Sequence, residues 1–140
     1  MTERDEADDL LDARRFVSLV VSSVRNPALQ GTLNTLREPP GRDPDADLVQ
    51  LSRWFHDLSQ ADRQMAARVI TFAVDSALFD MMCVLDGVRS VNPRPGVRQR
   101  LWLHAELEGG RRRLLNDPTG ANPDLHDLYK DAVIDAGLRE

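Results

Sequence analysis

Five polar side chains recur at spacings of nearly whole helical turns, which aligns them on one side of a helix: Gln64, Arg68, Thr71, Asp75 and Asp86. Two carboxylates and a guanidinium in such a row can form a polar groove, with Asp75 and Asp86 as acids and Arg68 as an anion clamp. The structural alternative is an internal ion pair between Arg68 and Asp75, because buried charges are normally paired. The residue pattern favours this structural interpretation over the polar groove (Arg68, Asp75 and Asp86).

A second set of residues suited to binding lies in the C-terminal half of the chain. Arg98, Arg100, Trp102 and His104 fall on one face if this segment is a strand, and Arg112 follows on the returning strand. An exposed Trp beside Arg is common at binding hot spots, and Arg with an aromatic ring can also stack on nucleotide bases. The alternative is that a helix covers Trp102. These five residues are the predicted binding surface, with a protein partner favoured over nucleic acid.

Other residue types that bind metals or act as nucleophiles do not form a motif. His126 and Asp127, with Asp124 and Asp131, have the right chemistry for metal binding, but a solvated helix face has the same composition. Cys83 falls in an apolar helix, where we expect an inert core thiol. The sequence also has no phosphate-binding glycine loop, nucleophile elbow or paired-His metal helix. We therefore predict no metal and no cofactor, and we favour a function without catalysis.

Charge is segregated along the chain, although the net charge is only −5. Residues 1–12 hold six acids against one base, and residues 88–113 hold seven Arg against two Glu. Because residues 13–140 together hold 17 acids and 17 bases, the protein is neither a globally basic nucleic-acid binder nor a uniformly acidic mimic of DNA.

Composition also indicates the compartment. The single Cys excludes an internal disulfide framework and favours a reducing environment. No apolar run approaches the roughly 20 residues needed to span a bilayer, and the start of the chain is acidic rather than basic as in a signal peptide. We expect a cytoplasmic protein with no membrane partner.

Hydrophobic periodicity predicts about five helices, at 3–25, 27–36, 47–58, 60–86 and 123–137. The break between the first two is expected at Asn26-Pro27, with Asn as the cap and Pro at the first helical position. The helix at 60–86 is apolar on nearly every side, which is typical of a helix in the middle of a domain. We expect the other helices to pack round it.

A β-hairpin is predicted after this helix. Residues 97–108 alternate apolar and polar side chains, Gly109-Gly110 is a two-residue turn signal, and 111–115 forms the returning strand. Residues 88–91 could add a third strand.

The two-residue turn would set Glu108 opposite Arg111 and Glu106 opposite Arg113, and both pairs have opposite charges. The expected fold is therefore mainly α with a small C-terminal β-hairpin (α+β), in a single globular domain of residues 1–140.

In size and composition the chain is similar to small cytosolic bacterial proteins that act by stoichiometric binding, such as immunity proteins that block a cognate toxin. This resemblance covers no specific motif. It implies a non-enzymatic protein-binding module, with immunity or antitoxin-like inhibition as its concrete form. Two alternatives are a nucleic-acid-associated regulatory protein that uses the basic hairpin at 97–115, and a small enzyme built on the polar groove. A homodimer is compatible with all three.

Overall fold

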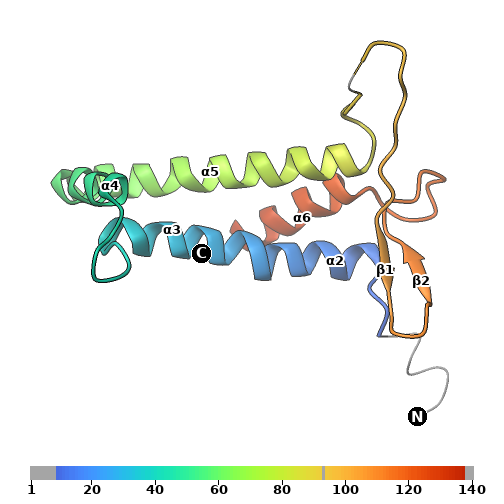
Figure 1. Ribbon diagram of the computed structural model, residues 1–140, viewed down its shortest axis with the longest axis horizontal. Helices are drawn as coiled ribbons and strands as arrows, with labels where there is room; N and C mark the ends of the chain where they lie inside the picture. The colour runs from blue at the N-terminus through green and yellow to red at the C-terminus, as the bar shows by residue number, and fades with distance from the viewer. Residues whose placement is uncertain (1–8, 93, 138–140) are drawn as a thin grey trace. The chain divides into compact units, whose positions relative to one another are not determined.

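The computed structural model describes residues 9–92 and 94–137. Within these ranges the fold is mainly helical, with one small two-stranded antiparallel sheet (Figure 1). The chain divides into two compact units, which we call unit 1 (residues 1–21 and 77–140) and unit 2 (residues 22–76). The single domain expected from the sequence stays a prediction, and each unit is described by itself below.

The first helical segment begins at Ala13, so the expected start at residue 3 is wrong for the described part of the chain. Asp12 caps this helix, because its backbone is extended and its carboxylate accepts a 2.7 Å hydrogen bond from the Arg15 N–H. Residues 9–12 are not helical, and the acidic side chains of residues 3–8 lie outside the described residues.

The break expected at Asn26-Pro27 does not occur. Segments α2 (Ala13–Val20), η1 (Val21–Arg25) and α3 (Asn26–Arg37) follow one another without interruption, and η1 is a π-helical turn. Proline has no N–H, and in a regular α-helix its ring clashes with the carbonyl four residues earlier. The wider π turn just before Pro27 replaces that regular geometry, so the helix continues. The described residues therefore contain four continuous helical stretches, one fewer than predicted.

The other helices match the predicted ranges closely: α4 (Ala46–Asp57), α5 (Gln60–Leu85) and α6 (Leu125–Gly137). The Ser59 hydroxyl caps the start of α5 by accepting a 3.1 Å bond from the Asp62 N–H, and it donates to the Asp62 carboxylate at 2.7 Å. Gly87 ends α5 with φ of +76°, a left-handed conformation that costs glycine little. These two local signals explain why the bounds of α5 were predictable.

The other helices do not pack round α5 on every side, so this part of the prediction is wrong. Of its residues only Met82 and Cys83 are fully buried, whereas Met65, Val69 and Phe72 are 54%, 61% and 75% exposed. An apolar helix is enclosed only where neighbours cover every side. Unit 2 supplies α3 and α4 as neighbours, and this exposed stripe of α5 lies beyond their cover.

The core of unit 1 is formed by α2, the C-terminal part of α5 and α6 (Figure 1). Its buried members share apolar side chains that point to one cluster: Ala13, Val17, Met82, Leu125, Leu128 and Tyr129. Leu103, which precedes the first strand, packs against this cluster and connects it to the hairpin.

The hairpin pairs β1 (His104–Glu106) with β2 (Arg112–Leu114) in a register one residue away from the prediction. Glu106 lies opposite Arg112, because the Leu107 N–H donates to the Arg111 carbonyl and three residues, not two, form the turn. Gly109 and Gly110 in this turn have φ of +101° and +85°. Glycine adopts these values without the steric cost that other residues pay.

The strands are shorter than predicted, and residues 88–91 form no strand. A strand needs a backbone partner, and the returning segment turns away after Leu115, whose N–H donates to the Leu103 carbonyl. Residues 97–102 therefore pair with no strand in the described part of the chain, although side chains from 103 to 108 still alternate between half-buried and exposed.

Candidate functional site

The structure does not join the three members of the predicted polar groove into one site. The Asp75 carboxylate binds Arg25, with 2.6 Å from Arg25 Nε to Asp75 Oδ1 and 3.2 Å from Nη2 to Oδ2. The Arg25 side chain is 10% exposed and the Asp75 side chain is 21% exposed. Arg68 is exposed and is not the partner of Asp75, so the internal ion pair was predicted with the wrong arginine.

Arg25 was missed by sequence reasoning, although one signal was available. It lies four residues after Val21 and eight after Val17, so it continues the apolar stripe of the first helix. A charge on such a stripe is expected to be buried and paired.

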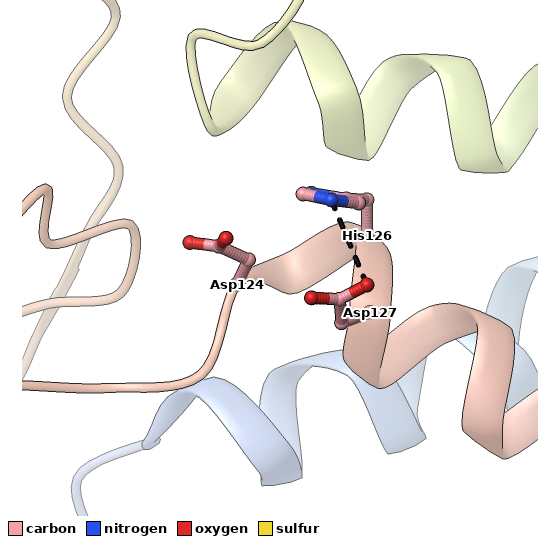
Figure 2. A group of neighbouring side chains, drawn as sticks. All are labelled: Asp124, His126 and Asp127. Carbon is pink, nitrogen blue, oxygen red and sulfur yellow. Dashed lines mark ion pairs between the residues drawn. The ribbon is translucent and has the colours of Figure 1, made fainter. Parts of the chain in front are cut away.

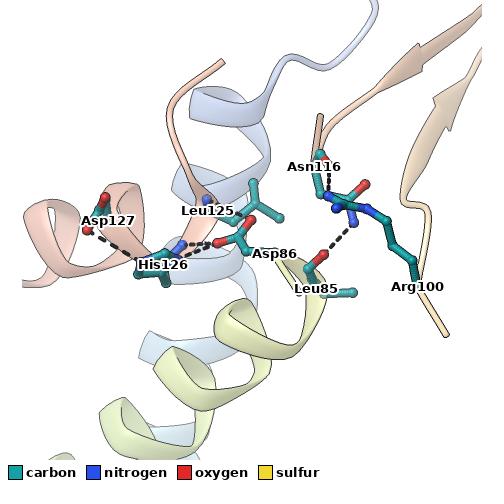
Figure 3. A network of polar contacts seen from close by, with 7 residues as sticks. All are labelled: Leu85, Asp86, Arg100, Asn116, Leu125, His126 and Asp127. Atoms are coloured by element: carbon teal, nitrogen blue, oxygen red, sulfur yellow. Dashed lines mark hydrogen bonds and ion pairs between the residues drawn. The ribbon is translucent and has the colours of Figure 1, made fainter. Parts of the chain in front are cut away.

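Asp86 belongs to a polar cluster at the start of α6, where Asp124, His126 and Asp127 lie together (Figure 2). The Asp86 side chain is only 3% exposed. It accepts hydrogen bonds from the N–H groups of Leu125 at 3.1 Å and His126 at 2.9 Å, and from His126 Nδ1 at 2.6 Å (Figure 3). Asp86 therefore caps α6 from the turn that follows α5, and it holds the His126 ring.

Asn116 is a buried polar residue that sequence reasoning did not single out. Its Oδ1 accepts from the Leu103 N–H, and its Nδ2 donates to the carbonyls of Leu85 and Leu101. Arg100 Nη2 donates to the Asn116 carbonyl at 3.1 Å (Figure 3). These bonds attach the segment before β1 to the end of α5.

The predicted binding surface is partly assembled. The Arg100 guanidinium lies over the Trp102 ring, 4.9 Å from its centroid, and Trp102 is 54% exposed rather than covered by a helix. His104 is also exposed. Arg112 forms an exposed ion pair of 2.9 Å with Glu106, which reduces the positive charge that it offers to a ligand.

Arg98 and Arg100 also line a hollow of about 240 Å³, together with Arg89. Arg89 is paired with Asp80 at 2.9 Å. The structure thus brings two of the predicted binding arginines together, with a third that the prediction did not include.

Unit 2 contains an apolar groove that the sequence analysis did not identify as a site. The groove has a volume of about 570 Å³ and lies among α3, α4 and α5. Its walls include Leu36, Leu51, Trp54, Met65 and Val69. Leu51 and Trp54 lie three residues apart on α4, which places them on one apolar stripe, and they are 47% and 50% exposed. The same apolar stripe is typical of a core and of an interface, so no sequence signal distinguished the two.

The groove carries little charge. Among the described residues that line it, Asp62 is the one with a charge, and its carboxylate accepts from the Ser59 hydroxyl. Thr32 is the other polar wall residue. Such a surface suits an apolar partner with few polar groups.

Cys83 is buried beside Met82, and burial raises the pKa of its thiol, against the lowering effect of nearby Arg89. The thiol therefore stays protonated at neutral pH, which is a property of an unreactive cysteine.

No family model matches the chain, and no curated protein or solved structure matches it either. Among the described residues, no helix has both the length and the apolar character to cross a membrane.

Proposed function

We propose that the protein is a non-enzymatic protein-binding module whose docking surface is the apolar groove of unit 2. The observation that carries this proposal is the exposure of four large apolar side chains on or beside the groove. Trp54 is 50% exposed, and the exposed α5 stripe of Met65, Val69 and Phe72 is 54–75% exposed. Burial of apolar surface is favourable by roughly 25 cal/mol per Å², and contiguous apolar patches on proteins mark interaction sites.

The partner that fits this groove is an amphipathic helix of a second protein. Three helices flank the groove, and a helix can place an apolar side chain every third or fourth residue into such a channel. Asp62 at the wall favours a Lys or Arg on that helix beside its apolar face.

In its concrete form, the proposal is a cytoplasmic immunity or antitoxin-like inhibitor that binds its target stoichiometrically. A groove with apolar walls supports this form because stable complexes bury an apolar centre within a polar rim. The alternative enzyme built on the polar groove loses support, because Asp75 and Asp86 are bound by different partners.

The groove is tested by photocrosslinking in the host cell. A photoreactive phenylalanine analogue placed at Phe72 should crosslink to one discrete protein, whereas the same analogue at Val88, 65% exposed in unit 1, should not. The purified partner should then bind the full chain at 1:1, and Val69→Asp should weaken that binding at least tenfold.

Val88→Asp is the matched control, since it adds the same charge at a similarly exposed valine. Unchanged binding by Val69→Asp, or no crosslink from position 72, would contradict the proposal. A crosslink only to a second copy of the chain would replace the partner helix with a homodimer.

A second candidate function is nucleic-acid binding by the basic hairpin. The observation that favours it is the hollow lined by Arg89, Arg98 and Arg100, beside the exposed Trp102 ring. Mobility shifts across a salt series decide between the two functions. Binding that weakens with salt and with Arg98→Ala would favour nucleic acid, and no binding at low salt would exclude it.

A further inference from the structure

The His126 ring at the start of α6 is held in one orientation. Asp86 Oδ2 lies 2.6 Å from His126 Nδ1, and the Phe79 ring packs against His126 edge to face with centroids 5.8 Å apart. A carboxylate that accepts from the Nδ1–H leaves Nε2 as the ring nitrogen available to a ligand. The His126 side chain is 17% exposed, so it is accessible at its edge.

Two further carboxylates lie close to this ring. Asp127 Oδ1 lies 3.7 Å from His126 Nε2, and one ligand atom each from Asp124, His126 and Asp127 lies within 4.8 Å of the others (Figure 2). Figure 3 shows the ring between Asp86 on one side and Asp127 on the other.

The Asp124 side chain does not cap α6. It directly precedes α6, where an aspartate normally accepts bonds from the first N–H groups of the helix through its own side chain. Here the Asp86 carboxylate accepts the hydrogen bonds from the N–H groups of Leu125 and His126 instead. Within the described residues the Asp124 side chain has no hydrogen bond or ion pair, so its carboxylate is available to a ligand. This separates the cluster from an ordinary acidic helix start.

The charge of the cluster is also unbalanced. Three carboxylates, Asp86, Asp124 and Asp127, surround a single imidazole. In the described part of the chain, neither Asp124 nor Asp127 is paired with an arginine or lysine. The partial positive charge at a helix start offsets only about half an elementary charge.

We infer that Asp124, His126 and Asp127 form a binding site for a divalent transition-metal cation such as Zn²⁺, in unit 1 and independent of the groove. One imidazole nitrogen and two carboxylates suit this class, whereas Mg²⁺ and Ca²⁺ prefer oxygen ligands alone. Asp86 is the positioning residue, because a metal-binding histidine commonly donates its other ring N–H to a carboxylate. Three protein ligands leave a coordination position for water.

The test uses the full chain, freed of metal by a chelator and titrated with Zn²⁺ by calorimetry and with Co²⁺ by visible absorption. We expect one equivalent to bind, with a Co²⁺ spectrum that lacks a thiolate charge-transfer band, since Cys83 is not a ligand. Asp124→Asn and Asp127→Asn replace exposed carboxylates with neutral amides and should each weaken binding at least tenfold. Asp135→Asn removes an exposed acid elsewhere on α6 and should bind like the unmodified chain.

The positioning role of Asp86 has its own measurement. Asp86→Asn should weaken Zn²⁺ binding about 10- to 100-fold, and it should alter the Co²⁺ spectrum because the imidazole is no longer oriented. If this variant fails to fold, the two exposed variants decide the inference. The inference is overturned if Zn²⁺ shows no saturable binding, or if Asp124→Asn and Asp127→Asn bind Zn²⁺ as tightly as the unmodified chain. It is also overturned if Asp135→Asn loses as much Zn²⁺ affinity as those two variants.

Discussion

Unit 1 and unit 2 cover their apolar side chains to different degrees. In unit 1, Val17, Leu125 and Tyr129 are at most 1% exposed, and they belong to one cluster formed by three helices. In unit 2, Phe55 is buried, but its neighbour Trp54 is half exposed and Phe72 is three-quarters exposed. Both units are built from helices with apolar stripes. The comparison shows that a stripe becomes a core only where another element covers it.

The two units also use buried charge differently. In unit 2, Asp75 takes two bonds from the Arg25 side chain, so one charge is matched by another. In unit 1, Asp86 takes two bonds from backbone N–H groups and one from His126. The first pair ties η1 to α5, whereas the second sets where α6 begins and how an imidazole is oriented.

The largest expected effect is a difference in lost stability between the core of unit 1 and the groove of unit 2. Leu125→Ala removes a side chain with 0% exposure and should lower the free energy of unfolding by about 2–5 kcal/mol. Val69→Ala at the groove should change it by less than about 0.5 kcal/mol. Urea denaturation measures both. If Val69→Ala lowers the free energy of unfolding as much as Leu125→Ala does, the groove is covered in solution. The contrast between the covered core of unit 1 and the exposed groove of unit 2 would then be wrong.

A smaller effect is expected from the ion pair of unit 2. Asp75→Asn leaves the Arg25 guanidinium without its carboxylate and should cost about 2–3 kcal/mol, less than for a fully buried pair because Asp75 is 21% exposed. Arg112→Ala breaks the exposed pair with Glu106 and should cost less than about 1 kcal/mol. Equal losses in the two variants, measured by urea denaturation, would contradict the contrast between buried and exposed pairs.

The smallest effect concerns the loop before α6. The Thr119 N–H and hydroxyl donate to the Asp117 carboxylate, and these bonds lower the pKa of Asp117 below the ordinary value of an aspartate. Because the folded pKa lies below the unfolded one, the stabilisation is present above the unfolded pKa and is lost as pH falls through the folded pKa. Carboxyl NMR titration should show the pKa rising part of the way back in Thr119→Val, since the backbone bond remains. No rise would assign the whole shift to the backbone N–H.

Much of the fold was predictable because its signals are local. The bounds of α4 and α5 follow from apolar periodicity and from the caps at Ser59 and Gly87. The hairpin was predicted at the right place, but its register was not, because one additional residue in the turn shifts every cross-strand pair. The uninterrupted helix through Pro27 was missed because a π turn has no sequence signature of its own.

The candidate sites were predictable in part. Asp75 and Asp86 were identified as residues able to do chemistry, but their partners Arg25 and His126 lie 50 and 40 residues away. Trp102 and Arg100 are close in sequence, so their association was foreseeable, and the structure places the Arg100 guanidinium over the Trp102 ring. The apolar groove was not foreseen, because its residues have the composition of a core.

The sequence by itself determined where the helices form, which of their faces are apolar and which residues carry charge. These properties depend on side chains three or four positions apart. Only the tertiary structure decided that Leu125 is covered while Val69 is exposed, and that Asp86 holds His126 rather than joining Asp75. The physical reason is that burial and pairing depend on which distant segments come into contact, and the same local pattern is compatible with either outcome.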